Sequence, residues 1–118
     1  MQRLYFALDL DDDPAAIAAY EDWHRSDRIW PEIVSQLRAD GVHELELFRC
    51  GNRLVMVKQV PDELADQDTA SHQDKRTQEW EQLMWQFQRP LPFAKPGQKW
   101  VPMARLFSLR QTLGEDES

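Results

Sequence analysis

The chain has 118 residues, of which 42% are hydrophobic and 30% charged, a composition that suits one packed domain and excludes a disordered chain or a two-domain cofactor enzyme. Fourteen basic and 21 acidic residues give a formal net charge of −7, which argues against binding to nucleic acid or to an anionic membrane surface. The one cysteine, Cys50, excludes a disulfide framework and cysteine-only metal sites. Because no charged-then-apolar leader opens the sequence, we expect a cytoplasmic protein with one domain over 1–118, ending in a loose acidic tail at 113–118.

The first third of the chain predicts a strand followed by two helical segments. Residues 3–10 place leucine and phenylalanine side chains at period two, which is typical of a strand with one apolar face. Asp-Pro at 13–14 then supplies an N-cap and a first-turn proline, and helical spacing continues as far as His24. A second helical stretch begins at Pro31 and ends at Asp-Gly, 40–41.

The middle of the chain predicts a β-hairpin. Two segments rich in leucine, valine and methionine, 43–50 and 53–60, are separated by Gly51 and Asn52. Two turn-forming residues between apolar segments are a strong hairpin signal. Residues 61–74 are polar and without a pattern, so we expect a loop or a frayed connector there.

The last part predicts a second main helix, an arm and a final strand. Apolar residues return at helical spacing over 77–88, prolines make 89–99 an extended arm, and 103–109 has the pattern of a strand. The resulting order predicts an α+β, ferredoxin-like βαββαβ domain whose four-stranded antiparallel sheet carries its helices on one face. Because the other face is left uncovered, we expect a homodimer of the dimeric α+β barrel type.

Tyr20 and His24 are the first candidates for chemistry. They are four residues apart and therefore share one face of the predicted helix. Imidazole suits proton transfer near neutral pH, and a neighbouring phenol can orient it or bind a hydroxyl. The structural alternative is a half-buried helix C-terminus where His24 complements the helix dipole. The other histidines, His43 and His72, follow at spacings of 19 and 29 residues, which fit no compact metal-ligand pattern.

Tryptophan is unusually frequent in this short chain. Flat apolar rings beside polar groups are common in sites for sugars and other neutral ligands, although small domains also need large side chains in the core. Trp80 follows Glu79, so a ring face and a carboxylate lie next to each other. From the residues alone, Trp80 either binds a ligand or serves core packing, since it heads the apolar stripe of the predicted helix. Three others are expected to serve packing: Trp23, Trp85 and Trp100.

Several motifs together resemble the L-rhamnose mutarotase family. They are Tyr20-x-x-x-His24, Ile29-Trp30-Pro31-Glu32-Ile33 and the Gly41 that precedes the hairpin. Further segments are similar to the L-fucose branch of that family: Gly51-Asn52-Arg53-Leu54, Glu79-Trp80-Glu81-Gln82-Leu83-Met84-Trp85, Leu91-Pro92, and then Trp100 and Phe107. The resemblance spans about residues 3–109 and is specific as a combination.

The resemblance implies a dimeric ferredoxin-like enzyme that interconverts the α and β anomers of a 6-deoxy-hexose without cofactor or metal. It implies that His24 is the proton donor and Tyr20 the phenol that binds substrate. Trp80 matches the second of two adjacent sugar-binding tryptophans, and Glu79 stands in place of the first. Leu45 stands where the family has an aromatic residue early in the second strand.

The hypothesis is therefore a small-sugar mutarotase that acts by general acid–base catalysis. His24 as imidazolium would protonate the ring oxygen, Tyr20 would bind the sugar or steer His24, and Glu79 or Glu32 would accept the anomeric proton. Trp80, together with Trp30, would pack on the apolar side of the sugar. The alternatives are a non-catalytic ligand-binding dimer on the same fold and an oxygenase of the related dimeric barrels.

Overall fold

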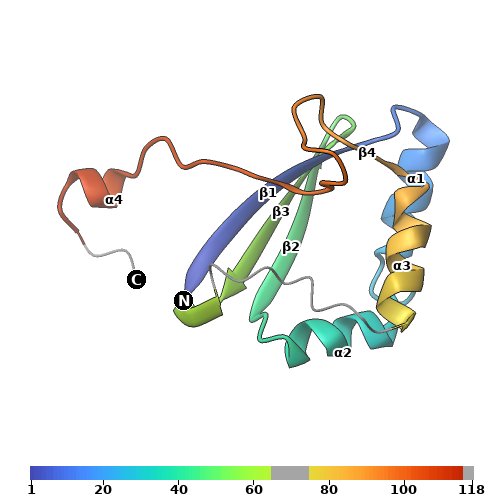
Figure 1. The fold of residues 1–118 in the computed structure, drawn as a ribbon, viewed down its shortest axis with the longest axis horizontal. Helices are drawn as coiled ribbons and strands as arrows, with labels where there is room; N and C mark the ends of the chain where they lie inside the picture. Colours follow the sequence, from blue (N-terminus) through green and yellow to red (C-terminus); the bar gives the residue numbers. More distant parts are fainter. Residues whose placement is uncertain (65–74, 116–118) are drawn as a thin grey trace.

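The computed structural model describes residues 1–64 and 75–115, in which helices α1, α2 and α3 lie on one side of a curled antiparallel sheet (Figure 1). The elements in chain order are β1 (Gln2–Leu10), α1 (Pro14–Trp23), α2 (Pro31–Ala39), β2 (Glu44–Cys50), β3 (Arg53–Val60), the 3₁₀ turn η1 (Asp62–Leu64), α3 (Lys75–Trp85), β4 (Gln88–Arg89), β5 (Val101–Pro102) and α4 (Leu109–Thr112). Most of the loop expected over 61–74, with His72, and the end of the acidic tail lie outside the described residues.

The sheet has the strand order β2-β3-β1-β4, and β5 also pairs with β1. All of these pairings are antiparallel. This order is the one that the βαββαβ connection produces, so the predicted ferredoxin-like α+β fold is confirmed. The hairpin is also confirmed, because Cys50 pairs with Arg53 across a two-residue turn in which Gly51 has a φ of 60°.

Strand register divides the sheet into two faces. Phe6 of β1 and Leu47 of β2 both pair with Met56 of β3. Leu47 and Met56 line a cavity together with residues of α1, α2 and α3, so these three side chains belong to the face that the helices cover, which we call the covered face. Their neighbours Tyr5 and Glu46 both pair with Val57. Because successive side chains alternate between faces, Tyr5, Glu46 and Val57 lie on the opposite side of the sheet, which we call the open face.

Helices α1 and α2 begin and end within a residue of where the sequence predicts. Asp13 caps α1 by accepting a hydrogen bond from the backbone N–H of Ala16 at 3.0 Å, and Pro14 occupies the first turn. Helix α1 ends at Trp23, with His24 as its C-cap residue. Apolar side chains from α1 and α3 then pack on β1 and β3. The buried core cluster consists of Leu10, Tyr20, Leu54, Trp80 and Met84.

The last strand differs from its prediction. In place of one strand over 103–109, two short strands, β4 and β5, share the edge of β1, so the sheet has five strands rather than four. After Pro102, Met103 still donates its backbone N–H to the carbonyl of Tyr5 in β1 at 2.8 Å. The residues beyond it form no strand, and Leu106 is 95% exposed. The chain then leaves the sheet as a C-terminal extension that carries α4 (Figure 1).

The predicted second main helix is confirmed, but it ends earlier, at Trp85. Phe87 then donates its backbone N–H to the carbonyl of Met84 in a tight turn, and Gln88 pairs with Leu10 as part of β4. Within the described ranges, no helix is both long and apolar enough to span a bilayer.

Candidate active site

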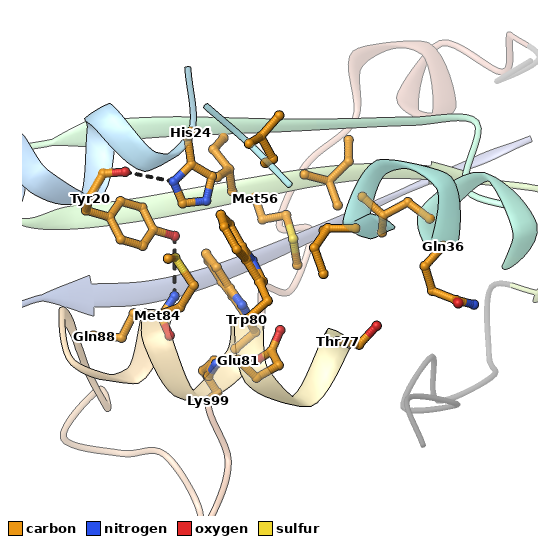
Figure 2. A pocket seen from close by; sticks show the side chains of 16 residues that line it. Tyr20, His24, Gln36, Met56, Thr77, Trp80, Glu81, Met84, Gln88 and Lys99 are labelled. Carbon is orange, nitrogen blue, oxygen red and sulfur yellow. Dashed lines mark hydrogen bonds and ion pairs between the residues drawn. The ribbon is translucent and has the colours of Figure 1, made fainter. Parts of the chain in front are cut away.

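A pocket of about 150 Å³ lies between the covered face of the sheet and helices α1, α2 and α3 (Figure 2). Its apolar wall comes from strands, helices and the arm after β4: Ile29, Ile33, Leu37, Leu45, Leu47, Met56, Trp80, Met84 and Trp100. A smaller set of polar side chains also lines it: Tyr20, His24, Gln36, Thr77, Glu81, Gln88 and Lys99. An apolar cavity with a few convergent polar groups is the usual form of a small-ligand site.

His24 presents one ring nitrogen to this pocket. Its Nδ1 lies 2.8 Å from the backbone carbonyl oxygen of Tyr20 (Figure 2). Because a carbonyl oxygen only accepts hydrogen bonds, Nδ1 carries a hydrogen, and Nε2 remains as the nitrogen that exchanges a proton. Burial lowers the pKa of His24 from its usual 6.5, while the hydrogen bond to Tyr20 acts in the opposite direction.

Tyr20 lies directly beside this imidazole, with ring centroids 4.4 Å apart. Its hydroxyl oxygen accepts a hydrogen bond from Nε2 of Gln88 at 3.3 Å. Burial raises the pKa of Tyr20 to about 12, and the negative charge of Glu81 acts in the same direction, while the Gln88 bond opposes it. The phenol is therefore protonated at any physiological pH, and its O–H is available to donate to a ligand.

Trp80 is the centre of the aromatic cluster. It is 6% exposed, and the rings of Trp23, His24 and Trp30 approach it edge-on, with centroid distances of 6.5, 5.5 and 5.2 Å. Edge-on contacts of this kind fix the orientation of an indole. Tyr20 and His24, which the spacing of four predicts on one helix face, line the pocket together with Trp80.

Trp30 and Glu79 are not among the lining residues, although the Trp30 ring contacts that of Trp80. The guanidinium of Arg76 lies 3.8 Å from the centroid of the Trp30 ring. Arg76 also pairs with Glu79 at 3.2 Å and with Glu32 at 3.4 Å. One arginine thus holds both carboxylates that the sequence suggested as proton acceptors, and all three side chains are about half exposed.

Sequence reasoning missed Glu81, Gln88 and Lys99, all of which line the pocket. A signal for Glu81 existed, because the spacing i, i+3, i+4, i+7 that forms one helix face is met by Thr77, Trp80, Glu81 and Met84. No local pattern could indicate Lys99, which reaches the pocket through the packing of the arm. Trp100, expected to serve packing alone, also lines the cavity.

Among the described residues, no three histidine, cysteine, aspartate or glutamate side chains converge as a metal site. His43 lies just before β2 and is exposed, away from this pocket.

Comparison with known proteins gives a consistent result. A family model described as L-rhamnose mutarotase matches residues 3–109. The L-fucose mutarotase of Xanthomonas campestris pv. campestris is 47% identical over 115 residues, which cover 96% of this chain and 92% of the relative. The L-rhamnose mutarotase of Acidiphilium cryptum is 30% identical over 112 residues, which cover 92% and 99% of the two chains.

Solved structures agree on the fold. A crystal structure of an L-rhamnose mutarotase from Formosa agariphila superposes with a TM-score of 0.66 at 23% identity, covering 92% of this chain and 99% of that one. The tetracenomycin F2 cyclase of Streptomyces glaucescens, a type-II polyketide cyclase, superposes with a TM-score of 0.59 at 16% identity, covering 92% and 98%. At these identities the likeness concerns the fold alone, since one fold hosts many functions.

Proposed function

The chain belongs to the L-rhamnose mutarotase family, and from this premise we propose that it interconverts the α and β anomers of a 6-deoxy-L-hexose, L-fucose or L-rhamnose. The observation that carries the proposal is the 47% identity with an L-fucose mutarotase over nearly the whole chain. The pocket supports it, because apolar rings, an imidazole and a phenol suit a neutral sugar with one methyl group. Mutarotase activity is accordingly favoured over a non-catalytic binding dimer.

Each site residue predicted from the sequence has a role in this proposal. His24 is the catalytic acid, which exchanges its proton through Nε2. Tyr20 donates its O–H to the sugar, because Gln88 already occupies its oxygen as a donor. Trp80 packs on the apolar side of the sugar. Trp30 and Glu79 contribute to binding indirectly. Trp30 contacts the Trp80 ring, and Glu79 pairs with the arginine that stacks on Trp30.

The reaction needs two proton transfers and no covalent bond to the protein. The imidazolium of His24 gives its Nε2 proton to the ring oxygen while the anomeric hydroxyl loses its own proton. The C1–O5 bond then breaks and C1 becomes a free aldehyde. Rotation about C1–C2 followed by reclosure, with both protons returned, yields the other anomer. General catalysis of this kind contributes about 10²–10⁴-fold.

Saturation-transfer NMR between anomers tests this function directly. The anomeric protons of the α and β forms of L-fucose, or of L-rhamnose, are resolved, so saturating one reports the exchange rate into the other. We expect the purified protein to accelerate exchange of at least one sugar, and its closer relative favours L-fucose. Exchange of both sugars at the buffer rate contradicts the proposal. Sugar line broadening without faster exchange would instead support the binding-dimer alternative.

We also propose that the chain acts as a homodimer whose two sheets meet through their open faces. The exposure of Tyr5 (42%) and Phe48 (53%) on that face supports this arrangement. Sedimentation at micromolar concentration tests it, because a species of one chain contradicts it.

The cytoplasm remains the proposed location, supported by an exposed free thiol at Cys50, and fractionation of cells expressing the chain tests it.

A further inference from the structure

An ion pair between a largely buried lysine and a glutamate whose side chain is 47% exposed forms part of the pocket wall outside the residues that the family resemblance assigns. Lys99, on the arm after β4, has a side chain only 11% exposed, and its ammonium pairs with Oε2 of Glu81 on α3. The same ammonium lies 4.7 Å from the centroid of the Trp85 ring. A cation this far from water needs a fixed counter-charge. Lys99 therefore holds the Glu81 carboxylate in place.

Glu81 is the one carboxylate among the described residues that line the pocket. Figure 2 shows Glu81 and Lys99 on the α3 side of the cavity, whereas Tyr20 and His24 enter it from α1. The charge of Glu81 acts on this shared space, since it contributes to the raised pKa of the Tyr20 phenol. The other two candidate acceptors, Glu79 and Glu32, pair with Arg76 and do not line the pocket.

Anomer exchange needs a group that takes the proton from the anomeric hydroxyl while His24 serves the ring oxygen. We propose that Glu81 is this second acid–base residue, and that Lys99 positions its carboxylate opposite His24. The inference rests on the proposed mutarotase function and completes its reaction. It follows from three facts of the pocket: one carboxylate, one ammonium that fixes it, and an imidazole on the opposite wall.

Protons and bonds balance in this scheme. During opening, His24 loses a proton to the ring oxygen, Glu81 gains one from the anomeric hydroxyl, and the C1–O5 electron pair leaves with the ring oxygen. During closure, the hydroxyl at C5 attacks C1 and returns its proton to His24. Glu81 protonates the new anomeric oxygen. The protein ends as it began, without any co-reactant.

The variant Glu81→Gln tests the role of the carboxylate, because it keeps the shape of the side chain and removes its basicity. We expect the maximal exchange rate for the sugar that the wild type accelerates to fall by about 10²-fold, with a smaller change in KM. The rate should also lose its decline on the acidic side of the pH profile. The matched control is Glu21→Gln, which removes an exposed carboxylate paired with Arg49 outside the pocket and should keep the wild-type rate.

Lys99→Met tests the positioning role, since methionine retains the apolar stem and removes the charge. Without its cation the carboxylate binds a proton more readily, so the acidic limb of the pH profile should move to higher pH. The conservative variant Lys99→Arg should return the limb towards its wild-type position. A lysine that merely tied the arm to α3 would leave the profile unmoved.

The outcomes separate the two proposals. Wild-type protein at the buffer rate overturns the mutarotase function, and this inference with it. An active wild type with an equally active Glu81→Gln overturns the role of Glu81 alone. Should Glu81→Gln fail to fold, as judged by circular dichroism, the profile of Lys99→Met decides: an acidic limb at the wild-type pH overturns the inference, and a shifted limb supports it.

Discussion

The two faces of the sheet are made by the same three long strands and serve different purposes. On the covered face, residues such as Leu8 and Leu54 are buried, and Leu45, Leu47 and Met56 of the same face line the pocket beneath the helices. On the open face, Tyr5 and Phe48 are exposed beside the charged side chains of β2 and β1. The alternation of side chains along a strand thus separates a site for chemistry from a surface for assembly.

Burial explains why the chemistry belongs on the covered face. Removing water from around Tyr20 and His24 moves the pKa of each in the direction that favours its neutral form. An imidazolium formed in such a place is a stronger acid than one in water. Substitutions on the two faces should therefore differ sharply in their effect on anomer exchange, and the following predictions test that contrast.

The largest effect is expected from His24→Ala. The variant removes the group that exchanges a proton with the ring oxygen, so the exchange rate should fall by about 10²–10⁴-fold. Saturation-transfer NMR measures this loss, and free imidazole added to the solution should restore part of the rate. The matched control is His43→Ala, which removes an exposed imidazole outside the pocket. Equal rates for His24→Ala and wild type would remove His24 from the mechanism.

The pH dependence of the same reaction tests the direction in which the pKa of His24 is shifted. Because the pKa of His24 is lowered, the imidazolium fraction of the free protein declines as the pH rises through a value below 6.5. The quantity kcat/KM should therefore decrease from pH 5 to pH 7 along this limb. A limb centred above pH 6.5 would contradict the assignment.

Trp80 and Trp85 provide the next contrast, between a buried and an exposed ring on one helix. Trp80 is 6% exposed and contacts three other rings, whereas Trp85 is 38% exposed. Trp80→Ala should lower the free energy of unfolding by about 3–5 kcal/mol, and Trp85→Ala by about 1 kcal/mol, a typical value for a point variant. Urea denaturation followed by circular dichroism measures both. Equal losses would show that Trp80 is not the centre of the cluster.

Tyr20 should make the fold sensitive to alkali. Its pKa is raised to about 12 in the folded chain, against 10 for an unperturbed phenol, so the stabilisation is complete below pH 10 and is lost as the pH rises from 10 to about 12. Two pKa units correspond to about 2–3 kcal/mol. Urea denaturation across this range should show the decline, and Tyr20→Phe should reduce it. In Tyr5→Phe, absorbance at 295 nm reports the titration of Tyr20 alone.

Most of the fold follows from local patterns in the sequence. Asp13 and Pro14 begin α1 as predicted, and Gly51 forms the expected turn. The strand predicted over 103–109 is wrong because an apolar pattern shows that a segment can pair but not where pairing stops. Here Met103 still donates its backbone N–H to Tyr5 of β1, and the residues beyond it stay outside the sheet, with Leu106 95% exposed. Strand pairing is a property of the whole chain, beyond the reach of a local window.

The candidate site likewise combines residues that local sequence patterns predict with residues that they do not. Tyr20 and His24 were predictable because a spacing of four places side chains together on a helix. Glu81 and Lys99 are 18 residues apart, and their contact depends on how a proline-rich arm packs against α3. From the sequence, Glu79 and Glu32 were the candidate acceptors, although the structure pairs both side chains with Arg76.

The smallest effect on the pocket is expected from the open face. Phe48→Ser removes an aromatic side chain that is 53% exposed, so the free energy of unfolding of the single chain should change by no more than about 0.5 kcal/mol. If two sheets meet on this face, a hydroxyl there weakens their contact, and sedimentation should shift towards the single chain. Val34→Ser, which alters an exposed apolar residue on α2, is the control and should leave the assembly intact. Because Phe48 lies across the sheet from His24, the rate of anomer exchange per chain should equal the wild-type rate in both variants. A lower rate in Phe48→Ser alone would mean that assembly shapes the pocket through the sheet.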